Sequence, residues 1–270
     1  MTIPNFRDQI KIVFFDIDDT LFVRSKDLLV KSVQPAIQKL HANGIKTVIA
    51  TGRSRCSFPQ KLNQMLIEEQ MDTFVTINGQ FTYHKDHILT HYPIDTGKLQ
   101  KLTEFFEQQD IAYGFVGHQQ IAVSAKTTML QGALNSVTTN YIVDKNFFKN
   151  NVVYQMLPFY NLQQEPTVLA ANLLDGLKTV RWHENSVDIL DADGSKARGI
   201  NAVLQHFGLQ IENAMAFGDG LNDVEMFQTV GVGVAMGNAH DTLKEKADYI
   251  TDHVEEHGVY NFLQKSGLID

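Results

Sequence analysis

The chain has 270 residues, 43% of them hydrophobic, which is enough for a large core and for two domains. Its formal net charge is -8, from 23 basic and 31 acidic side chains, which argues against a nucleic-acid-binding surface. Because the overall charge would repel an anionic substrate, cations close to the site would have to attract it. A single cysteine, Cys56, excludes an internal disulfide, and no stretch approaches a membrane span of about 20 apolar residues. We expect a cytoplasmic protein that binds neither nucleic acid nor membrane.

The first notable stretch is Asp16-Ile17-Asp18-Asp19-Thr20. It follows residues 10–15, a short apolar run rich in β-branched and aromatic side chains, which predicts a buried strand. Two carboxylates therefore sit at the carboxyl end of a strand, where open parallel sheets bind ligands. One carboxylate can act as a nucleophile and the other can donate and then abstract a proton.

The next segments alternate between helix and strand. Residues 33–40 have the apolar spacing of a helix. Residues 45–50 form a second apolar run, which predicts a strand and ends at Thr51-Gly52-Arg53. Residues 73–77 form a third such run, which ends at Asn78-Gly79. This order predicts an α/β fold with a Rossmann-like parallel sheet.

From about Gln80 the pattern changes to hairpins mixed with helices, typical of a separate α+β module. The parallel pattern returns near Lys196, which precedes a helix over 200–207, and continues with a strand over 214–217 that ends at Gly218-Asp219-Gly220-Leu221-Asn222-Asp223. We therefore expect a core domain made of residues 1–80 and 187–270, with an inserted cap domain of residues 81–186.

The polar clusters after the predicted strands are expected to converge, because the ends of parallel strands lie side by side. Together they suit phosphoryl transfer through an aspartyl phosphate. Asp16 would attack phosphorus, and Asp18 would protonate the leaving group and activate water. Oxygen ligands from Asp16, the region of Asp18 and Asp219 could hold Mg²⁺.

Phosphate-binding groups are expected around this centre. Lys196 can pair with the phosphate oxygens as a cation. The Thr51 hydroxyl and the loop amides near Ile17 and Gly52 can donate hydrogen bonds to the phosphate. Asn222 can donate a hydrogen bond to the phosphate or orient Lys196. Asp223 could support the loop or contact the metal.

In this order the four clusters resemble the motifs of the haloacid dehalogenase superfamily, and the chain is similar to its Cof-type subgroup. The resemblance implies a Mg²⁺-dependent phosphatase of sugar phosphates or other small phosphomonoesters. The long interval between Thr51 and Lys196 is where this group carries a type IIB cap. Asp19 is a departure, since the family often has Gly there.

Several roles stay open. Arg53 could bind phosphate or pair with a nearby aspartate, and His183 and Asn185 could touch the substrate or serve as ordinary loop residues. A phosphomutase would use the same core but needs arginines in the cap, and the span 81–186 contains only Arg181. A non-catalytic sensor of phosphorylated metabolites is a further alternative. The sequence indicates neither the natural substrate nor the oligomeric state.

Overall fold

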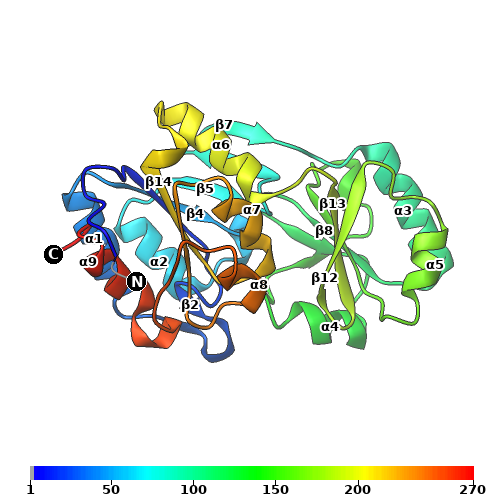
Figure 1. Ribbon diagram of the computed structural model, residues 1–270. Helices are drawn as coiled ribbons and strands as arrows, with labels where there is room; N and C mark the ends of the chain where they lie inside the picture. The colour runs from blue at the N-terminus through cyan, green and yellow to red at the C-terminus, as the bar shows by residue number, and fades with distance from the viewer. Residues whose placement is uncertain (1–2) are drawn as a thin grey trace. The chain divides into compact units, whose positions relative to one another are not determined.

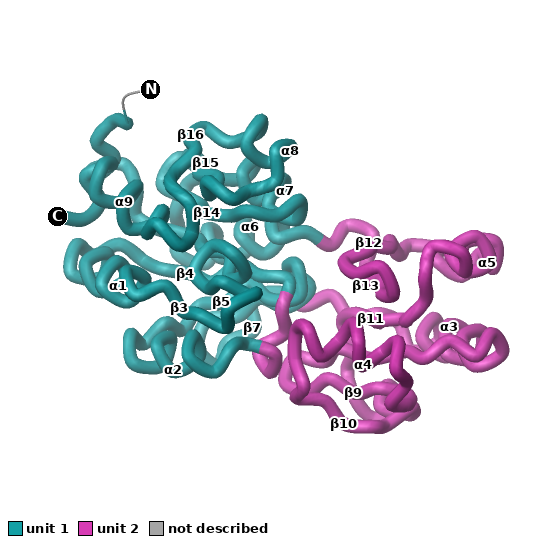
Figure 2. Tube along the Cα trace, turned by 90° about the horizontal axis from the view of Figure 1, so that it is seen from below, with its two compact units in different colours: residues 1–52, 58–90, 195–270 teal, residues 53–57, 91–194 magenta. Residues whose placement is uncertain are grey.

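The computed structural model describes residues 3–270 and divides them into two compact units (Figure 2). Of the described residues, the core unit comprises 3–52, 58–90 and 195–270, and the inserted unit comprises 53–57 and 91–194. Among the described residues, no helix combines the length and apolarity needed to cross a bilayer.

The core unit is built on an eight-stranded sheet with strand order β16-β15-β14-β1-β4-β5-β6-β7. Five neighbouring pairs, from β16 to β5, are parallel, and β6 is antiparallel to β5. The strands are β1 (Ile12–Phe15), β4 (Lys46–Ala50), β5 (Thr73–Thr76), β6 (Phe81–His84), β7 (His87–His91), β14 (Ala214–Gly218), β15 (Val232–Ala235) and β16 (Tyr249–Ile250). A separate ribbon pairs β2 (Phe22–Val23) with β3 (Leu28–Leu29).

Helices lie on both sides of this sheet, with α1 beside α9 and α6 beside α7 (Figure 1). Helices α2, α7 and α8 each connect two successive parallel strands, as in other α/β folds. The helices are α1 (Val33–Ala42), α2 (Gln60–Glu68), α6 (Lys196–Phe207), α7 (Val224–Phe227), α8 (Asp241–Lys244) and α9 (Gly258–Lys265). The central strands are buried on both faces, which explains why they read as continuous apolar runs in the sequence.

The inserted unit contains a six-stranded sheet of order β10-β9-β8-β11-β13-β12. Its pairs are antiparallel except β9 with β10. The elements are α3 (Thr96–Gln108), β8 (Tyr113–Val116), β9 (Ile121–Val123), α4 (Thr128–Leu134), β10 (Ile142–Val143), β11 (Gln155–Pro158), α5 (Glu165–Ala170), β12 (Leu177–His183) and β13 (Ser186–Asp191). One face of the sheet forms a core with α3 and α5, through residues such as Phe106, Met156 and Ile189.

Short 3₁₀ helices occupy several connections, namely η1 (Arg24–Lys26), η2 (Arg55–Ser57), η3 (Phe147–Lys149), η4 (Ile211–Asn213), η5 (Leu221–Asp223) and η6 (Val254–Glu256).

The unit boundaries differ from the predicted 80/81 and 186/187. The hairpin β6–β7 extends the core sheet next to β5, so the first boundary falls after Thr90. The whole of β12 and β13 belongs to the inserted sheet, and the second boundary falls after Gly194. The pattern of a hairpin gives no information about which sheet its strands join, so the sequence placed β6 and β7 on the wrong side.

Candidate active site

Asp16 directly follows β1 at the carboxyl edge of the parallel sheet. Its backbone N–H donates to the Phe217 carbonyl oxygen of β14 at 3.0 Å, which continues the strand pairing to the first motif residue. The residue is 6% exposed. A carboxylate is therefore held at a fixed point at the centre of the sheet, largely removed from solvent.

The chain turns sharply after Asp16. The Ile17 carbonyl accepts hydrogen bonds from the amides of Leu21 and Phe22 at 3.0 and 2.9 Å. Asp19 lies in the left-handed region with φ of 50°, a conformation that glycine adopts without strain. Its Oδ1 accepts the Arg24 amide at 3.2 Å, so the side chain stabilises the turn.

The loop after β14 is closed by Asp223. The Oδ2 atom of Asp223 accepts the backbone amides of Asp219 and Gly220, each at 3.0 Å. A Cβ atom on Gly218 would lie 2.4 Å from the Asp223 carboxylate, so only glycine leaves room for this contact. The Gly-Asp-Gly sequence thus lets a buried acid hold the loop that presents Asp219.

Lys196 is the first residue of α6, whose N-cap Ser195 accepts from the Arg198 amide. Its Nζ atom lies 2.6 Å from Oδ1 of Asp16 and 2.6 Å from Oδ1 of Asp223, and its side chain is fully buried. Burial alone would lower the pKa of Lys196, but the two carboxylates overcome this effect and raise it. The lysine is thus a fixed cation that joins the first motif to the last.

Two further strand ends meet this centre. Thr51, which follows β4, is 1% exposed. The Asn78 side chain, which follows β5, accepts from Nδ2 of Asn222 at 3.1 Å, and a Cβ on Gly52 would lie 3.2 Å from it. Sequence reasoning missed Asn78. An Asn-Gly pair directly after a buried strand was the available signal, and Asn78 indeed has a positive φ of 50°.

Gly79 fixes the position of α6. Its φ is +77°, and a Cβ on it would lie 2.0 Å from the Ser195 carbonyl oxygen. The close approach of this loop to the N-cap of α6 brings Lys196 to the sheet edge, so the geometry of the site depends on packing as well as on charge.

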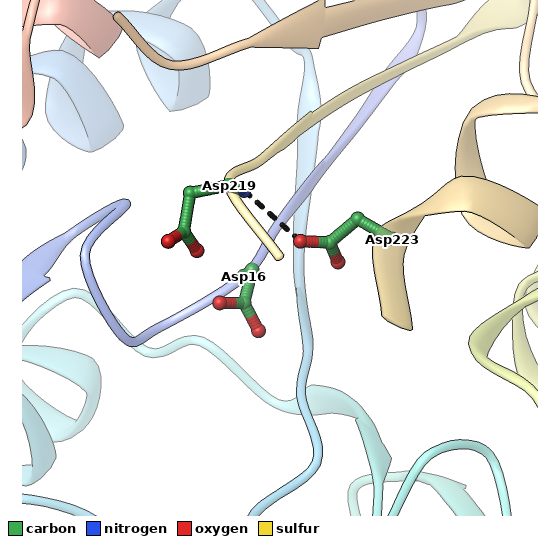
Figure 3. Close-up of side chains that lie close together, drawn as sticks. All are labelled: Asp16, Asp219 and Asp223. Atoms are coloured by element: carbon green, nitrogen blue, oxygen red, sulfur yellow. Dashed lines mark hydrogen bonds between the residues drawn. The ribbon is translucent and has the colours of Figure 1, made fainter. Parts of the chain in front are cut away.

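Asp16, Asp219 and Asp223 gather into one acidic group, with one oxygen from each lying within 4.8 Å of the others (Figure 3). Burial, with the charges of Asp223 and Asp18, raises the pKa of Asp16 to about 7, although Lys196 opposes the shift. Burial and the neighbouring acids raise the pKa of Asp219 to about 9. Three close carboxylates are not all stable as anions here with a single lysine.

This donor set fits a hard divalent cation. Its atoms are carboxylate oxygens, the ligands that Mg²⁺ and Ca²⁺ prefer. Both Asp223 oxygens already accept hydrogen bonds, whereas no hydrogen bond to the Asp219 carboxylate occurs among the described residues. Asp16 and Asp219 are therefore the carboxylates best placed to bind the ion, and Asp223 supports the loop and Lys196.

The acidic group does not include the carboxylate of Asp18, a residue that the sequence also offered as a metal ligand. The turn begins here, since the backbone of Asp18 forms an isolated bridge with Phe22. Its charge nevertheless raises the pKa of Asp16, so the two acids are near each other. The predicted roles of Asp18 in metal binding and proton transfer remain predictions.

The remaining candidate residues lie in the inserted unit. Nη1 of Arg53 donates to the carbonyl oxygens of Ser57 and Val137, at 2.6 and 3.0 Å. Nδ1 of His183 accepts the Asn185 amide at 3.1 Å, which stabilises the turn between β12 and β13. These contacts give structural roles to Arg53 and His183, and the predicted roles of Arg53, His183 and Asn185 at a phosphate or substrate remain predictions.

Known proteins share this arrangement along almost the whole chain. The family model for haloacid dehalogenase-like hydrolases matches residues 13–263. A Streptococcus pyogenes protein named "Putative bifunctional phosphatase/peptidyl-prolyl cis-trans isomerase" is 38% identical over 97% of this chain, which spans 55% of that relative's length. The Bacillus subtilis protein "Putative phosphatase YkrA" is 33% identical, with 96% of this chain and 98% of the relative covered.

A solved structure agrees with these relatives. A sugar phosphatase of haloacid dehalogenase subclass IIB superposes with a TM-score of 0.83 at 29% identity, covering 96% of this chain and all of the other. The sequence-predicted family and α/β fold class are therefore confirmed. The chain belongs to the haloacid dehalogenase superfamily, in its Cof-type group.

Proposed function

We propose that this protein is a Mg²⁺-dependent phosphatase that hydrolyses small phosphomonoesters through an aspartyl phosphate on Asp16. The observation that carries the proposal is the buried Asp16 carboxylate, which touches Lys196 at 2.6 Å and lies beside Asp219. Phosphoryl transfer through an aspartyl phosphate requires a nucleophile, a fixed cation and a metal-binding acid, and all three lie at one edge of the sheet.

The reaction proceeds in two displacements. An oxygen of Asp16 attacks phosphorus, the bond from phosphorus to the ester oxygen breaks, and Asp18 gives its proton to the departing alkoxide. Asp18, now ionised, then accepts a proton from water as the water oxygen attacks the phosphorus of the aspartyl phosphate. The bond from phosphorus to Asp16 breaks, which releases inorganic phosphate and restores both carboxyl groups.

Fixed donors stabilise the charge that develops on the phosphoryl oxygens. Lys196 is held by Asp223, Asn222 is held by Asn78, and the Thr51 hydroxyl stands at the neighbouring strand end. Donors that are already oriented need no rearrangement during the reaction, and this is the physical advantage of the buried network.

A bound Mg²⁺ would be held by Asp16 and Asp219 with support from Asp223, and would neutralise the charge between phosphate and carboxylates. Mg²⁺ is favoured over Ca²⁺ because its strict octahedral geometry at short distances suits a nucleophile that must be held in line with phosphorus.

A sugar phosphatase among the similar structures supports a small phosphorylated metabolite as substrate. The phosphomutase alternative is weaker, since a second phosphate needs cationic side chains. Arg181, the one arginine in residues 91–194, forms an ion pair with Glu165 at 3.3 Å and stacks on Tyr160. This arginine is already neutralised.

Turnover of p-nitrophenyl phosphate with and without Mg²⁺ tests the proposal, followed by a panel of phosphorylated sugars, nucleotides and cofactors. Metal-dependent release of phosphate supports a phosphatase. Tight binding of phosphate esters without turnover would instead favour the sensor, which retains the pocket and performs no chemistry.

A further inference from the structure

A cavity of about 420 Å³ lies in the core unit at the amino ends of β4 and β5, and all the residues that line it belong to that unit. The candidate active site lies at the other edge of the sheet, where the same strands end. Strand β4 begins with Lys46 at the cavity and ends one residue before Thr51, a span of roughly 16 Å at the usual rise of a strand. The phosphatase chemistry therefore does not use this cavity, whose volume is within the range of small-molecule sites.

The lining of the cavity combines apolar side chains with a cation. Ile45 and Met71 are both buried, and the ring of Phe207, at the end of α6, also lines the cavity. The Nζ atom of Lys46 lies 4.5 Å from the centroid of that ring, within the distance of a cation–π contact. A ligand in this cavity would meet an ammonium group directly beside a flat apolar surface.

A chain of hydrogen bonds fixes the protonation of His84, which also lines the cavity. The Thr73 hydroxyl donates to Oδ1 of Asp72 at 3.1 Å, so its oxygen accepts the hydrogen bond from Nδ1 of His84 at 2.8 Å. The neutral imidazole therefore carries its proton on Nδ1. The Asp72 carboxylate lies 3.3 Å from the same nitrogen and 3.8 Å from Nζ of Lys85, so two neighbours already engage it.

Positive charge exceeds negative charge around the cavity. Its lining includes two lysines, Lys46 and Lys85, and one acid, Asp72. Among the residues that the structure describes, Lys85 is joined to Asp72 and no ion pair joins Lys46 to an acid. Partial burial and the charges of His206, Lys85 and Lys46 lower the pKa of His84, although Asp72 opposes them. With its histidines neutral, the cavity carries one uncompensated positive charge.

This charge balance and the apolar lining restrict the ligand. A carboxylate brings one negative charge and oxygens that accept hydrogen bonds from an ammonium group. A phosphate dianion exceeds the one charge to be balanced, and would also be repelled by the Asp72 carboxylate. A carboxylate without an apolar body would leave Met71 and the Phe207 ring uncovered, whereas the ring of an aromatic acid can pack against them.

We propose that this cavity is a second ligand-binding site, which takes a small monoanionic carboxylate with a flat apolar body, such as an aromatic or heteroaromatic acid. The carboxylate pairs with Lys46, and the ring packs against Phe207. The backbone already holds both residues, since the Lys46 amide donates to the Lys11 carbonyl oxygen at 2.9 Å and Phe207 is the last residue of α6. The inference does not rest on the proposed phosphatase function.

Benzoate, a small aromatic acid, is the probe. It is added to the full chain while the proton–nitrogen NMR signals of the His84 imidazole are followed, and a His84→Gln variant assigns those signals. A saturable shift of the signals gives the dissociation constant. Lys46→Gln should weaken the binding of benzoate at least about fivefold, because it removes the charge that pairs with the carboxylate.

Lys11→Gln is the matched control. Lys11 precedes β1 at the same edge of the sheet, is exposed and does not line the cavity. Both variants lose one positive charge from neighbouring strands, so a general attraction of anions to this edge would be weakened equally in both. We expect the dissociation constant of benzoate to stay unchanged in Lys11→Gln.

Two further anions test the class of ligand. Acetate has the carboxylate without the ring, and should bind at least about tenfold more weakly than benzoate, because it buries almost no apolar surface. Phenylphosphonate has the ring and becomes a dianion at alkaline pH, where it should also bind more weakly than benzoate. His84 lines this cavity and not the active site, so its signals separate the two sites.

The pKa of His84 gives a second readout, which a lysine with only a structural role would not change. The charged groups around His84 are Asp72, Lys46, Lys85 and His206. A bound carboxylate adds a negative charge, which favours the imidazolium form. Benzoate should therefore raise the pKa of His84 in the wild-type protein, and much less so in Lys46→Gln.

The outcomes are distinct. A saturable shift that depends on Lys46 and on the aromatic ring, together with a raised pKa of His84, supports the site. Four results would each overturn the proposal: no saturable shift with benzoate, equal weakening in Lys46→Gln and Lys11→Gln, acetate binding as tightly as benzoate, or phenylphosphonate binding more tightly.

Discussion

Lys196 and Asp223 lie 2.6 Å apart, and neither side chain is exposed to solvent. The Asp223 carboxylate that holds the ammonium group also accepts the two loop amides that present Asp219. The phosphate-binding cation and the metal-binding loop therefore share one anchor, and disturbing it should affect both stability and chemistry.

Replacing Lys196 with methionine should cost about 3–5 kcal/mol of unfolding free energy, because it leaves Asp16 and Asp223 buried without their counter-charge. Urea unfolding measures this loss. Lys61→Met is the control: Lys61 pairs with Asp27 at 3.1 Å, but both side chains are exposed, so less than about 1 kcal/mol should be lost. Equal losses in the two variants would show that the buried network does not stabilise the fold.

Metal binding should depend on Asp219 but not on Asp19, although both acids lie near the site. We expect Mg²⁺ to raise the thermal midpoint of the wild-type protein and of Asp19→Asn, because ligand binding stabilises the folded state. Asp219→Asn should lose this effect and most of its turnover, and Ca²⁺ should replace Mg²⁺ poorly in activity. Full activity of the wild-type protein in excess EDTA would contradict a metal requirement.

The sequence predicted that the polar clusters meet at one edge of the sheet, because most of them follow a buried strand. The apolar runs before Asp16, Thr51 and Asp219 identify strands, and the ends of parallel strands must lie together. The resemblance to the haloacid dehalogenase superfamily rests on all four motifs in their order along the chain. It implied a phosphatase, which no single motif could establish.

The remaining features depend on tertiary contacts. The hairpin at 81–91 has the same pattern in either sheet, so its place in the core sheet was not predictable. The role of Asp223 depends on Lys196, which lies 27 residues away in sequence. Asp188 was predicted to lie in a strand, but its position between β11 and β12 follows from strand pairing that the sequence does not show.

Asp188 on β13 has a raised pKa, and this has a consequence for how stability depends on pH. Its folded-state pKa of about 7 lies above its ordinary value of 3.8, so its contribution to stability is complete below pH 4 and is lost as pH rises through 7. Asp188→Asn, which stays neutral, should become more stable relative to the wild-type protein by about 1 kcal/mol or more between pH 5 and 8. Urea unfolding at several pH values measures the difference. A difference that does not vary with pH would mean that Asp188 has an ordinary pKa.

Asp18→Asn should lose more activity on esters with poor leaving groups than on p-nitrophenyl phosphate, whose leaving group departs without a proton. The loss on a sugar phosphate should be about 10²–10⁴-fold, the usual contribution of general acid–base catalysis. Single-turnover rates of ester cleavage make the comparison, since they isolate the first displacement. Equal losses on both esters would argue against Asp18 as the acid.

The most direct test of the central claim is chemical trapping of the intermediate on Asp16. Asp18→Asn should accumulate the aspartyl phosphate from p-nitrophenyl phosphate and Mg²⁺, because it lacks the base that activates water for the second displacement. Borohydride reduction of the quenched enzyme, followed by peptide mass spectrometry, should find residue 16 converted to homoserine, only when substrate and Mg²⁺ were both present. Phosphate release by Asp18→Asn without modification of residue 16, or modification of a different carboxylate, would contradict a covalent mechanism through Asp16.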